Sequence, residues 1–297
     1  MTSATLHFEP KDYKSDLKPV WCPGCGDFGV LSALYKAMSQ CDLDPASTVI
    51  VSGIGCSSRL PGFVATYGFH SVHGRVLPVA TGIKAARPDL NVIAVGGDGD
   101  AYAIGGGHLP HCARRNPDIT YLVMNNNVYG LTKGQVSPTS MLAHATQSPR
   151  IDPKRWRTTP YGTIENTLDP ITQAIAWDIS FVARAFSYKP NQLTDLMVQA
   201  LKHKGFSLVD IFSPCPTNNL DQTEEYYKDH TFDVPADHDP TDRVQAFALS
   251  LHPDGFPIGV IYKHEGKPTL ADELQAIRHH FSGEATASLP GLFARFQ

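Results

Sequence analysis

The sequence predicts an α/β protein built on a doubly wound parallel sheet with helices on both faces. Three short runs, at 47–53, 90–97 and 118–125, are rich in β-branched residues and apolar on both faces, as strands buried inside a parallel sheet are. The segment 101–116 lies between the second and third runs and is predicted as a crossover helix. Alternation of strands and helices over residues 27–215 therefore indicates the doubly wound class.

The flanking elements continue this alternation. An apolar stripe predicts a helix over residues 27–41, with Asp27 as its N-cap. Further along the chain, 179–186 and 206–212 are predicted strands, and 191–205 is the helix between them. The residues of the stripe are Val30, Leu31, Leu34, Met38 and Cys41.

Two segments lack this regular pattern. Residues 130–170 are rich in Thr, Pro and Gly, and a loop of that length inside an α/β domain is usually functional or a lid. Residues 216–297 show two weak strands at best, one of them at 257–262, and one helix near 270–281. We therefore expect an α/β domain over residues 1–215 and an irregular C-terminal extension over 216–297 that packs on the domain or on a partner subunit.

Composition limits the functional classes. The 297 residues are 42% hydrophobic and 18% charged, which indicates a globular chain. A net charge of −4 gives no sign of nucleic-acid binding. No apolar run is long enough to span a membrane, and the N-terminus lacks the apolar region of a secretory signal, so we expect a cytoplasmic protein. Structural disulfides are rare there, and the six cysteines need another explanation.

The stretch 96–127, "GGDGDAYAIGGGHLPHCARRNPDITYLVMNNN", predicts a diphosphate–metal site. Asp98 closes one strand and Asn126 closes the next, so both lie at the edge of the sheet where open α/β folds bind cofactors. Gly97 and Gly99 allow the backbone to approach an anion, and the helix start that follows favours negative charge. A carboxylate and an amide oxygen suit Mg²⁺, which takes few protein ligands together with phosphate oxygens.

Other interpretations of this stretch exist. Gly, Asp and Asn are common turn residues, so two ordinary turns would carry the same letters. A dinucleotide site is disfavoured, because Gly53 and Gly55 are not followed by a third glycine; Ser58 stands there. GDG at one strand end and NN at the next strand end, 25 residues later, resembles the thiamine diphosphate fingerprint.

The cysteines gather at the same predicted edge. Cys22 and Cys25 precede the first helix, and Cys56 and Cys215 each follow a strand. A four-iron cluster, a zinc site, a redox dithiol and a disulfide turn all remain open from the spacing. One CxxC pair with two distant single cysteines suits a Cys₄ iron–sulfur cluster at least as well as zinc. The two other cysteines, Cys41 and Cys112, are predicted as small core residues within helices.

Taken together, the motifs resemble the β subunit of 2-oxoacid:ferredoxin oxidoreductases of the KorB or PorB type, the subunit that binds thiamine diphosphate. The resemblance implies the thiamine diphosphate-binding variant of the doubly wound fold. It also implies a [4Fe–4S] cluster on Cys22, Cys25, Cys56 and Cys215. The matching pieces are "WCPGCGDFG", "SGIGCSSR", "HSVHGRVLPVATGIK", "GGDGDAYAIGGGH", "MNNNVYGLTKGQVSPTS", "SPCPTNN" and "HDPTDR".

The resemblance further implies the roles of individual residues. The Mg²⁺ ligands fall on Asp98, Asn126 and the backbone carbonyl of Val128; the triplet of asparagines leaves the register one residue uncertain. His73 is implied near the reacting carbon of the cofactor, and Arg59 is implied as the cation that holds the substrate carboxylate. Lys133 and Arg75 are weaker candidates for a site role. The implied cofactor-binding residues are Ile54, Gly55, Cys56, Ser57, His73, Gly97, Gly99, Asp100, Gly130 and Leu131.

The implied activity is the reversible oxidative decarboxylation of a 2-oxoacid with CoA to acyl-CoA and CO₂, with two ferredoxins reduced. We favour 2-oxoglutarate, which gives succinyl-CoA; a pyruvate or broad-specificity enzyme is the alternative. The sequence shows no pyrimidine-binding domain, and the resemblance implies that an α subunit supplies the glutamate that activates thiamine, in an αβ or (αβ)₂ assembly. The rival classes are a non-redox thiamine diphosphate decarboxylase and a zinc-stabilised binding module.

Overall fold

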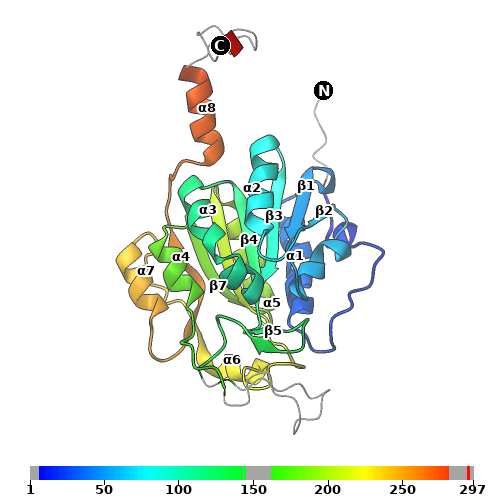
Figure 1. Cartoon of the computed structure of the whole chain (residues 1–297), viewed down its shortest axis with the longest axis vertical. Coiled ribbons are helices and arrows are strands. Elements are labelled where there is room, and N and C mark those ends of the chain that lie inside the picture. The colour runs from blue at the N-terminus through cyan, green and yellow to red at the C-terminus, as the bar shows by residue number, and fades with distance from the viewer. Residues whose placement is uncertain (1–6, 143, 145–161, 281–292, 295–297) are drawn as a thin grey trace.

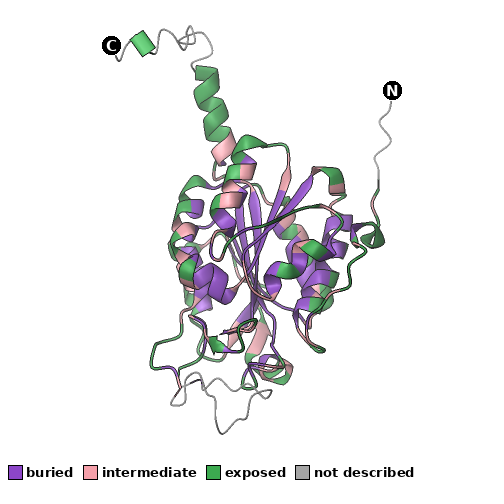
Figure 2. Cartoon of the chain, turned by 45° about the vertical axis from the view of Figure 1, so that its right-hand side comes forward, coloured by how far each residue is buried: buried purple, intermediate pink, exposed green. Residues whose placement is uncertain are grey.

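An eight-stranded sheet forms the centre of the molecule. The computed structural model describes residues 7–142, 144, 162–280 and 293–294. Each run predicted as a strand forms one, because its apolar side chains are buried between the layers on either side (purple in Figure 2). The strands are β1 (Thr48–Ser52), β2 (Tyr67–His70), β3 (Asn91–Gly97), β4 (Ile119–Asn125), β7 (Phe181–Phe186), β8 (Phe206–Phe212), β9 (Thr231–Asp233) and β10 (Phe256–Lys263).

The sheet has the strand order β2-β1-β3-β4-β8-β7-β10-β9. All neighbouring strands are parallel except β10, which pairs antiparallel with β7. The predicted doubly wound α/β class is therefore confirmed; the two strands from the C-terminal region, β10 and β9, run antiparallel to the other six. Since β1, β3, β4 and β8 are parallel neighbours in this order, their carboxyl ends meet at one edge of the sheet.

Helices cover both faces of the sheet (Figure 1). The first and fifth helices belong to one apolar core, whereas four other helices pack in a second core on the opposite face. The last helix stands away from the body in Figure 1, and none of its residues is buried. The helices are α1 (Asp27–Gln40) and α5 (Pro190–Lys202) on one face, α2 (Val76–Ala86), α3 (Leu109–Arg115), α4 (Pro170–Ala176) and α7 (Arg243–Ser250) on the other, and α6 (Glu224–His230) and α8 (Leu270–His280) beyond them.

Two details of the predicted helices are wrong. Gly26, not Asp27, is the N-cap of α1; Asp27 lies inside the helix, and its Oδ1 accepts a hydrogen bond from Ser213 Oγ at 2.6 Å. The predicted crossover helix 101–116 is broken into a π-helical turn, Gly99–Ile104, a 3₁₀ turn, Gly106–His108, and α3. Three successive glycines at 105–107 disfavour a continuous helix, which explains the break.

The C-terminal region is more regular than the sequence indicates. Besides the predicted strand at β10 and the predicted helix at α8, it contains α6, β9 and α7, which are too short for a clear periodic pattern. Part of this region is integral to the sheet, since β9 and β10 extend it beyond β7. The division of the chain at residue 215 stays a prediction.

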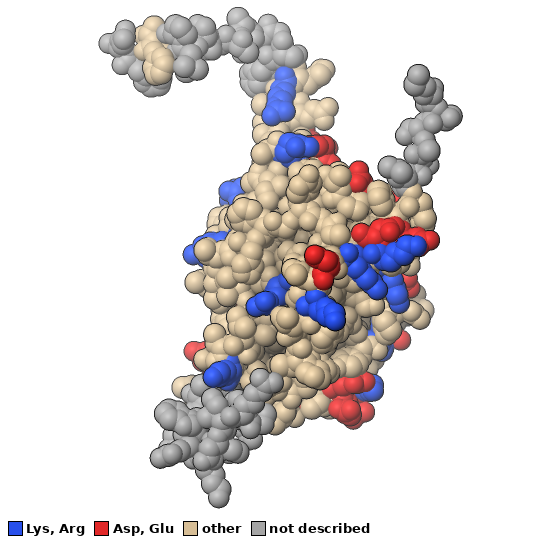
Figure 3. All heavy atoms as spheres, turned by 90° about the vertical axis from the view of Figure 1, so that its right-hand side faces the viewer, with Lys and Arg blue, Asp and Glu red and all other residues tan. Residues whose placement is uncertain are grey.

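The predicted loop 130–170 lies only partly in the described residues, since 143 and 145–161 are outside them. The described part is mostly irregular; beside it lies a small hairpin of β5 (Val128–Tyr129) and β6 (Gln135–Val136). None of the helices in the described ranges has the length and apolarity needed to cross a bilayer. On the face shown in Figure 3, basic and acidic side chains are interspersed, and no continuous basic surface is visible.

Candidate active site

A cleft lies at the carboxyl ends of β1, β3 and β4. The chain turns leaving these three strands line it, because parallel neighbours end at the same edge. The structure brings together here every residue predicted for thiamine diphosphate or magnesium, and adds Tyr129 and Thr132. The predicted residues are Ile54, Gly55, Cys56, Ser57, His73, Gly97, Asp98, Gly99, Asp100, Asn126, Val128, Gly130 and Leu131.

Asp98 is a buried carboxylate at the end of β3, only 1% exposed. Its Oδ2 accepts a hydrogen bond from Thr139 Oγ1 at 2.9 Å, and its Oδ1 lies 3.4 Å from the backbone N–H of Asn126. Burial raises the pKa of Asp98, and these hydrogen bonds offset part of that rise. A hard cation beside Asp98 would stabilise its ionised form, so the carboxylate fits a magnesium ligand.

Of the three successive asparagines, Asn126 is the one that lines the cleft. The side chain of Asn125 points elsewhere: its Nδ2 donates to Asp210 Oδ1 at 3.2 Å. The Oδ1 of Asn126 accepts from the backbone N–H of Val128 at 3.1 Å, which folds the two predicted ligand residues into one turn. This geometry favours the register in which Asn126 faces the metal.

Asn127 holds that turn in place through a left-handed backbone conformation, φ 60°. Its Nδ2 donates to the carbonyl oxygen of Thr139 at 2.7 Å, and its Oδ1 accepts from the hydroxyl of Tyr227 at 3.0 Å. Asn219 adds a bond from its Nδ2 to the carbonyl oxygen of Asn126 at 3.0 Å. Sequence analysis missed Thr139, Tyr227 and Asn219, since each acts across a long separation in the chain.

Asp100 contacts the chain around the cleft. Its Oδ1 accepts from the backbone N–H groups of Ile54 at 3.0 Å and Gly74 at 2.8 Å, and from His73 Nδ1 at 2.7 Å. Gly53 is required beside it, because an added Cβ there would lie 2.0 Å from Asp100 Oδ2. Asp100 therefore fixes the orientation of His73, which lines the cleft and whose Nδ1 is engaged.

A second pocket adjoins the cleft and is lined by the four predicted cluster cysteines, Cys22, Cys25, Cys56 and Cys215. Cys56, Asn126, Gly130 and Leu131 line both the pocket and the cleft, so the two share a wall. Within the described residues, none of these four cysteines forms a disulfide.

Backbone contacts assemble the cysteine pocket from three distant segments. The backbone N–H of Gly26 donates to the carbonyl oxygen of Pro214 at 3.1 Å, which ties the first cysteine pair to Cys215. A side chain at Gly26 would not fit, since its Cβ would lie 2.7 Å from the Cα of Ser213. The indole Nε1 of Trp21 donates to the carbonyl oxygen of Cys56 at 2.7 Å and joins the third segment.

Three thiols of this pocket, those of Cys25, Cys56 and Cys215, are costly to ionise without a cation. Burial raises the pKa of Cys56 to about 12, and it also raises the pKa values of Cys25 and Cys215. Bound iron would supply the positive charge that stabilises the thiolates. In the described ranges no three His, Cys, Asp or Glu side chains are close enough to hold a single metal ion. Cysteines spaced around a cavity fit a multi-iron cluster, in which each thiolate binds a different iron.

The other cysteines lie away from this pocket. Cys112 is 3% exposed and belongs to the apolar core, as predicted. Cys41 is partly buried and is the C-cap residue of α1 rather than a residue within it.

The predicted cations differ in their surroundings. Arg59 and Lys133 are exposed and line the cysteine pocket, where Arg59 lowers the pKa of Cys56 against the larger effect of burial. Arg75 is directed to the backbone, since its Nη1 donates to the carbonyl oxygens of Gly74 at 3.2 Å and Ile104 at 3.3 Å. Arg59 and Lys133 are thus placed for an anion beside the cysteines, and Arg75 supports the chain near His73.

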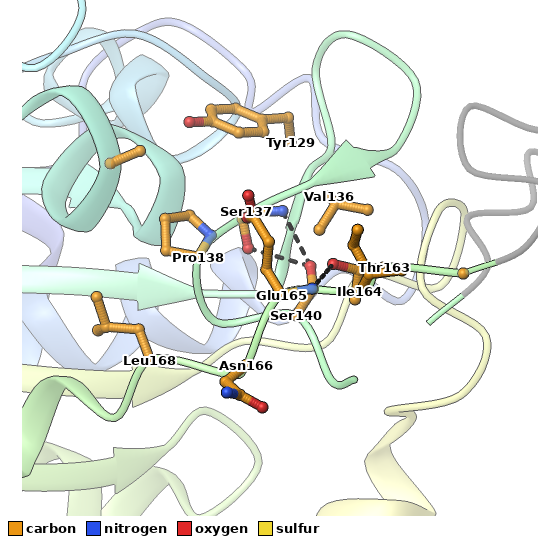
Figure 4. Close-up of a pocket in the computed structure, with 12 residues that line it drawn as sticks. Tyr129, Val136, Ser137, Pro138, Ser140, Thr163, Ile164, Glu165, Asn166 and Leu168 are labelled. Atoms are coloured by element: carbon orange, nitrogen blue, oxygen red, sulfur yellow. Dashed lines mark hydrogen bonds between the residues drawn. The ribbon is translucent and has the colours of Figure 1, made fainter. Parts of the chain in front are cut away.

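The turn at 137–140 contributes Ser137, Pro138 and Ser140 to the lining of a third pocket, drawn in Figure 4. Within the turn, the backbone N–H of Ser137 donates to Ser140 Oγ at 2.9 Å. Ser140 Oγ in turn donates to the carbonyl oxygen of Asn127 at 2.5 Å. Thr139 of this turn donates to Asp98, so the turn contacts one predicted magnesium ligand directly and the residue after the other, Asn127. Tyr129 lines both this pocket and the cofactor cleft.

Comparison with known families agrees with this arrangement. The model described as "Thiamine pyrophosphate enzyme, C-terminal TPP binding domain" matches residues 53–211. The model for the C-terminal part of the pyruvate ferredoxin oxidoreductase beta subunit matches residues 215–279.

Individual relatives cover most of the chain. A 2-oxoacid:ferredoxin oxidoreductase subunit beta from Aeropyrum pernix is 39% identical over 90% of this chain and 87% of its own. The 2-oxoglutarate synthase subunit KorB of Methanocaldococcus jannaschii is 42% identical over 71% of this chain and 75% of its own. Among solved structures, a 2-oxoglutarate:ferredoxin oxidoreductase from Magnetococcus marinus, with 2-oxoglutarate, coenzyme A and succinyl-CoA bound, superposes with a TM-score of 0.90. It is 43% identical and covers 98% of this chain and 96% of its own.

Proposed function

Since this chain belongs to the β subunits of 2-oxoacid:ferredoxin oxidoreductases, we propose that it binds thiamine diphosphate, Mg²⁺ and one [4Fe–4S] cluster to oxidise 2-oxoglutarate. The products would be succinyl-CoA and CO₂, with CoA as the acyl acceptor and ferredoxin as the electron acceptor. The observation that carries the proposal is the wall shared by the cofactor cleft and the cysteine pocket. Cys56 and Gly130 lie in that wall, so a cofactor and a cluster would be immediate neighbours.

The residues of the cleft have separate tasks in this proposal. Asp98, the Asn126 side chain and the Val128 carbonyl would hold Mg²⁺ with the diphosphate. When bound, thiamine diphosphate supplies a carbanion equivalent at the keto carbon, and the cluster accepts the electrons singly. His73 would hold or move a proton at Nε2, because its Nδ1 is engaged by Asp100. The glycines at 97 and 99 leave room for the phosphates.

The substrate assignment to 2-oxoglutarate is supported by the Magnetococcus marinus enzyme, whose structure contains that compound. The exposed cations Arg59 and Lys133 at the cysteine pocket are the candidates for its carboxylates. A pyruvate or broad-specificity enzyme would need fewer cations there. The cytoplasmic location inferred from the sequence stays a prediction.

A second polypeptide is required, because this chain is one part of a multi-subunit oxidoreductase. We propose that an α subunit packs over the exposed apolar side chains Tyr67, Phe69, Val72 and Ile104, which are 48–68% exposed. Tyr67, Phe69 and Val72 precede His73, which lines the cleft. Ile104 lies next to Gly74, the residue after His73. Exposed apolar surface of this kind marks protein interfaces. The α subunit would there supply the glutamate that this chain lacks, in an αβ or (αβ)₂ assembly.

A visible spectrum of the anaerobically purified protein tests the proposal against its rivals. We expect a broad iron–sulfur absorption near ~400 nm that bleaches on reduction. A colourless protein containing one zinc would favour a binding module, and a colourless protein that binds thiamine diphosphate would favour a non-redox decarboxylase. Co-expressed with its α subunit, the enzyme should reduce ferredoxin faster with 2-oxoglutarate than with pyruvate; the reverse order would contradict the substrate assignment.

A further inference from the structure

Asn218 connects the cysteine pocket to the cofactor cleft. It lies three residues after Cys215 and is only 7% exposed. Its Nδ2 donates to the carbonyl oxygen of Gly130 at 3.0 Å and to Cys215 Sγ at 3.8 Å. A side-chain amide nitrogen carries two hydrogens, so it can serve both acceptors at once. Gly130 itself lines both the pocket and the cleft.

The sulfur of Cys215 receives other donors from the same turn. The backbone N–H groups of Thr217 and Asn218 also donate hydrogen bonds to it. Asn218 therefore presents both a backbone and a side-chain donor to one sulfur. For Cys56, by contrast, neighbouring charges rather than hydrogen bonds accompany burial. The four cysteine positions are thus unequal in their hydrogen bonding.

We infer that Asn218 sets the reduction potential of the cluster by donating a hydrogen bond from Nδ2 to Cys215 Sγ. This inference rests on the proposed function, since it needs a cluster on Cys215. A one-electron reduction adds negative charge to the cluster and its sulfurs, so an N–H donor stabilises the reduced form more than the oxidised form. The donor therefore raises the potential. The same Asn218 amide also donates to the carbonyl oxygen of Gly130, which lines the cofactor cleft. The donor to the cluster sulfur is therefore held in place by the wall of that cleft.

The experiment is a redox titration of the αβ holoenzyme, followed by the EPR signal of the reduced cluster. Asn218→Leu removes the donor with little change in volume, and Asn218→Asp replaces it with an acceptor of similar shape. We expect the midpoint potential to fall in both variants, and further in Asn218→Asp because the carboxylate adds negative charge. The control is Gln192→Leu, which removes a side-chain amide that lines neither the cleft nor the cysteine pocket and whose Nε2 donates to Asp233 Oδ1; its potential should equal that of the wild type.

The results separate the inference from the proposed function. Variants with full iron content and the wild-type potential would overturn the role of Asn218. If Asn218→Leu loses iron, its potential cannot be measured, and Asn218→Asp then tests the inference: a lower midpoint potential supports the role of Asn218, and the wild-type potential contradicts it. Loss of the cluster from both would mean that Asn218 holds the pocket together rather than tuning it, which also contradicts the inference. A wild-type preparation without iron would instead contradict the proposed function.

Discussion

The cofactor cleft and the cysteine pocket share a wall but are organised differently. The cleft is built by turns that leave adjacent parallel strands, and Asp98 and Asp100 are held there by hydrogen bonds from several directions. The cysteine pocket is assembled from three segments far apart in the chain, tied by contacts such as Gly26 to Pro214. Burial raises the pKa values of its Cys25, Cys56 and Cys215 thiols.

This difference indicates how each site responds to its ligand. The cleft has its geometry fixed by the sheet, so a metal and a diphosphate would enter a prepared site. In the cysteine pocket the backbone contacts fix where the cysteines lie, but the buried thiols stay protonated without a cation. Iron would therefore displace their protons as it binds. Changes in one site should therefore leave the other largely intact, and this separation can be tested.

The largest expected effect is that of Asp98→Ala on cofactor binding. Removing the carboxylate leaves Mg²⁺ with only an amide and a carbonyl from the protein, so thiamine diphosphate affinity should fall by at least about 100-fold. Titration calorimetry with Mg²⁺ present measures this loss. The EPR signal of the cluster should persist, and Asp89→Ala, an exposed aspartate paired with Arg87, is the control. Unchanged affinity would show that the metal assignment is wrong.

Cys215→Ser makes the reciprocal test. A serine hydroxyl is a poor iron ligand, so the cluster should be lost or degraded, as measured by iron content and the visible spectrum. Thiamine diphosphate affinity should change by less than about threefold, because the cleft is built by other strand ends. Cys41→Ser, outside the pocket, should keep its iron. A four-iron signal in Cys215→Ser would identify another residue as the fourth ligand.

The buried carboxyl of Asp27, beside the cysteine pocket, should make the folding stability depend on pH. Burial raises the pKa of Asp27 to about 6 in the folded chain, against an ordinary value of 3.8. Between these two values the folded state holds more protons than the unfolded state, so the stability contributed by Asp27 falls as pH rises through this window. The difference corresponds to about 3 kcal/mol, since one pKa unit is about 1.4 kcal/mol.

Asp27→Asn should remove that part of the pH dependence. Urea unfolding of the wild type and the variant at pH 4, 6 and 8 measures the effect; the stability of the variant relative to wild type should increase up to pH 6 and then level off. An equal pH dependence in both proteins would contradict the assigned pKa. Asp89→Asn, on the surface, is the control.

The smallest expected effect is that of Tyr227→Phe. The change removes the hydroxyl that donates to Asn127 Oδ1 and leaves a buried amide oxygen without that donor, which costs about 1 kcal/mol of stability. Mg²⁺ affinity should fall a few-fold as the turn at 126–128 loosens. Tyr226→Phe, at a partly buried neighbouring position, is the control for both measurements. Equal Mg²⁺ affinity in the two variants would exclude a role for Tyr227 in the turn.

Local sequence patterns predicted the strands and therefore the edge where the site residues gather. The runs at β1, β3 and β4 are apolar on both faces, so a parallel sheet follows from their composition alone. From that, the meeting of Asp98 and Asn126 follows as well. Residues that act across long separations were not predictable in this way. Asp27 bonds to Ser213 rather than capping its helix, and Asp100 orients His73 because a distant turn happens to fold against it.

The supporting residues show the same limit. Thr139 and Tyr227 bond to Asp98 and Asn127 on two sides of the predicted metal site, but nothing in their neighbouring sequence distinguishes them from other buried hydroxyls. Asn218 and Asn219 belong to the motif "SPCPTNN", yet their bonding partners on the turn at 126–130 were not apparent from it. Only the folded sheet brings these partners together, because β8 and β4 are adjacent in space and distant in the chain.

The position of Cys215 directly after β8 has a consequence for how the protein matures. The first cysteine pair leaves the ribosome early, whereas the last cysteine emerges after nearly the whole parallel sheet has been synthesised. Until β8 inserts beside β4, the thiols at 22 and 25 have no fourth companion. If the pocket holds the proposed cluster, iron and sulfide would therefore reach a chain that has already folded, in a pocket that Arg59 and Lys133 also line.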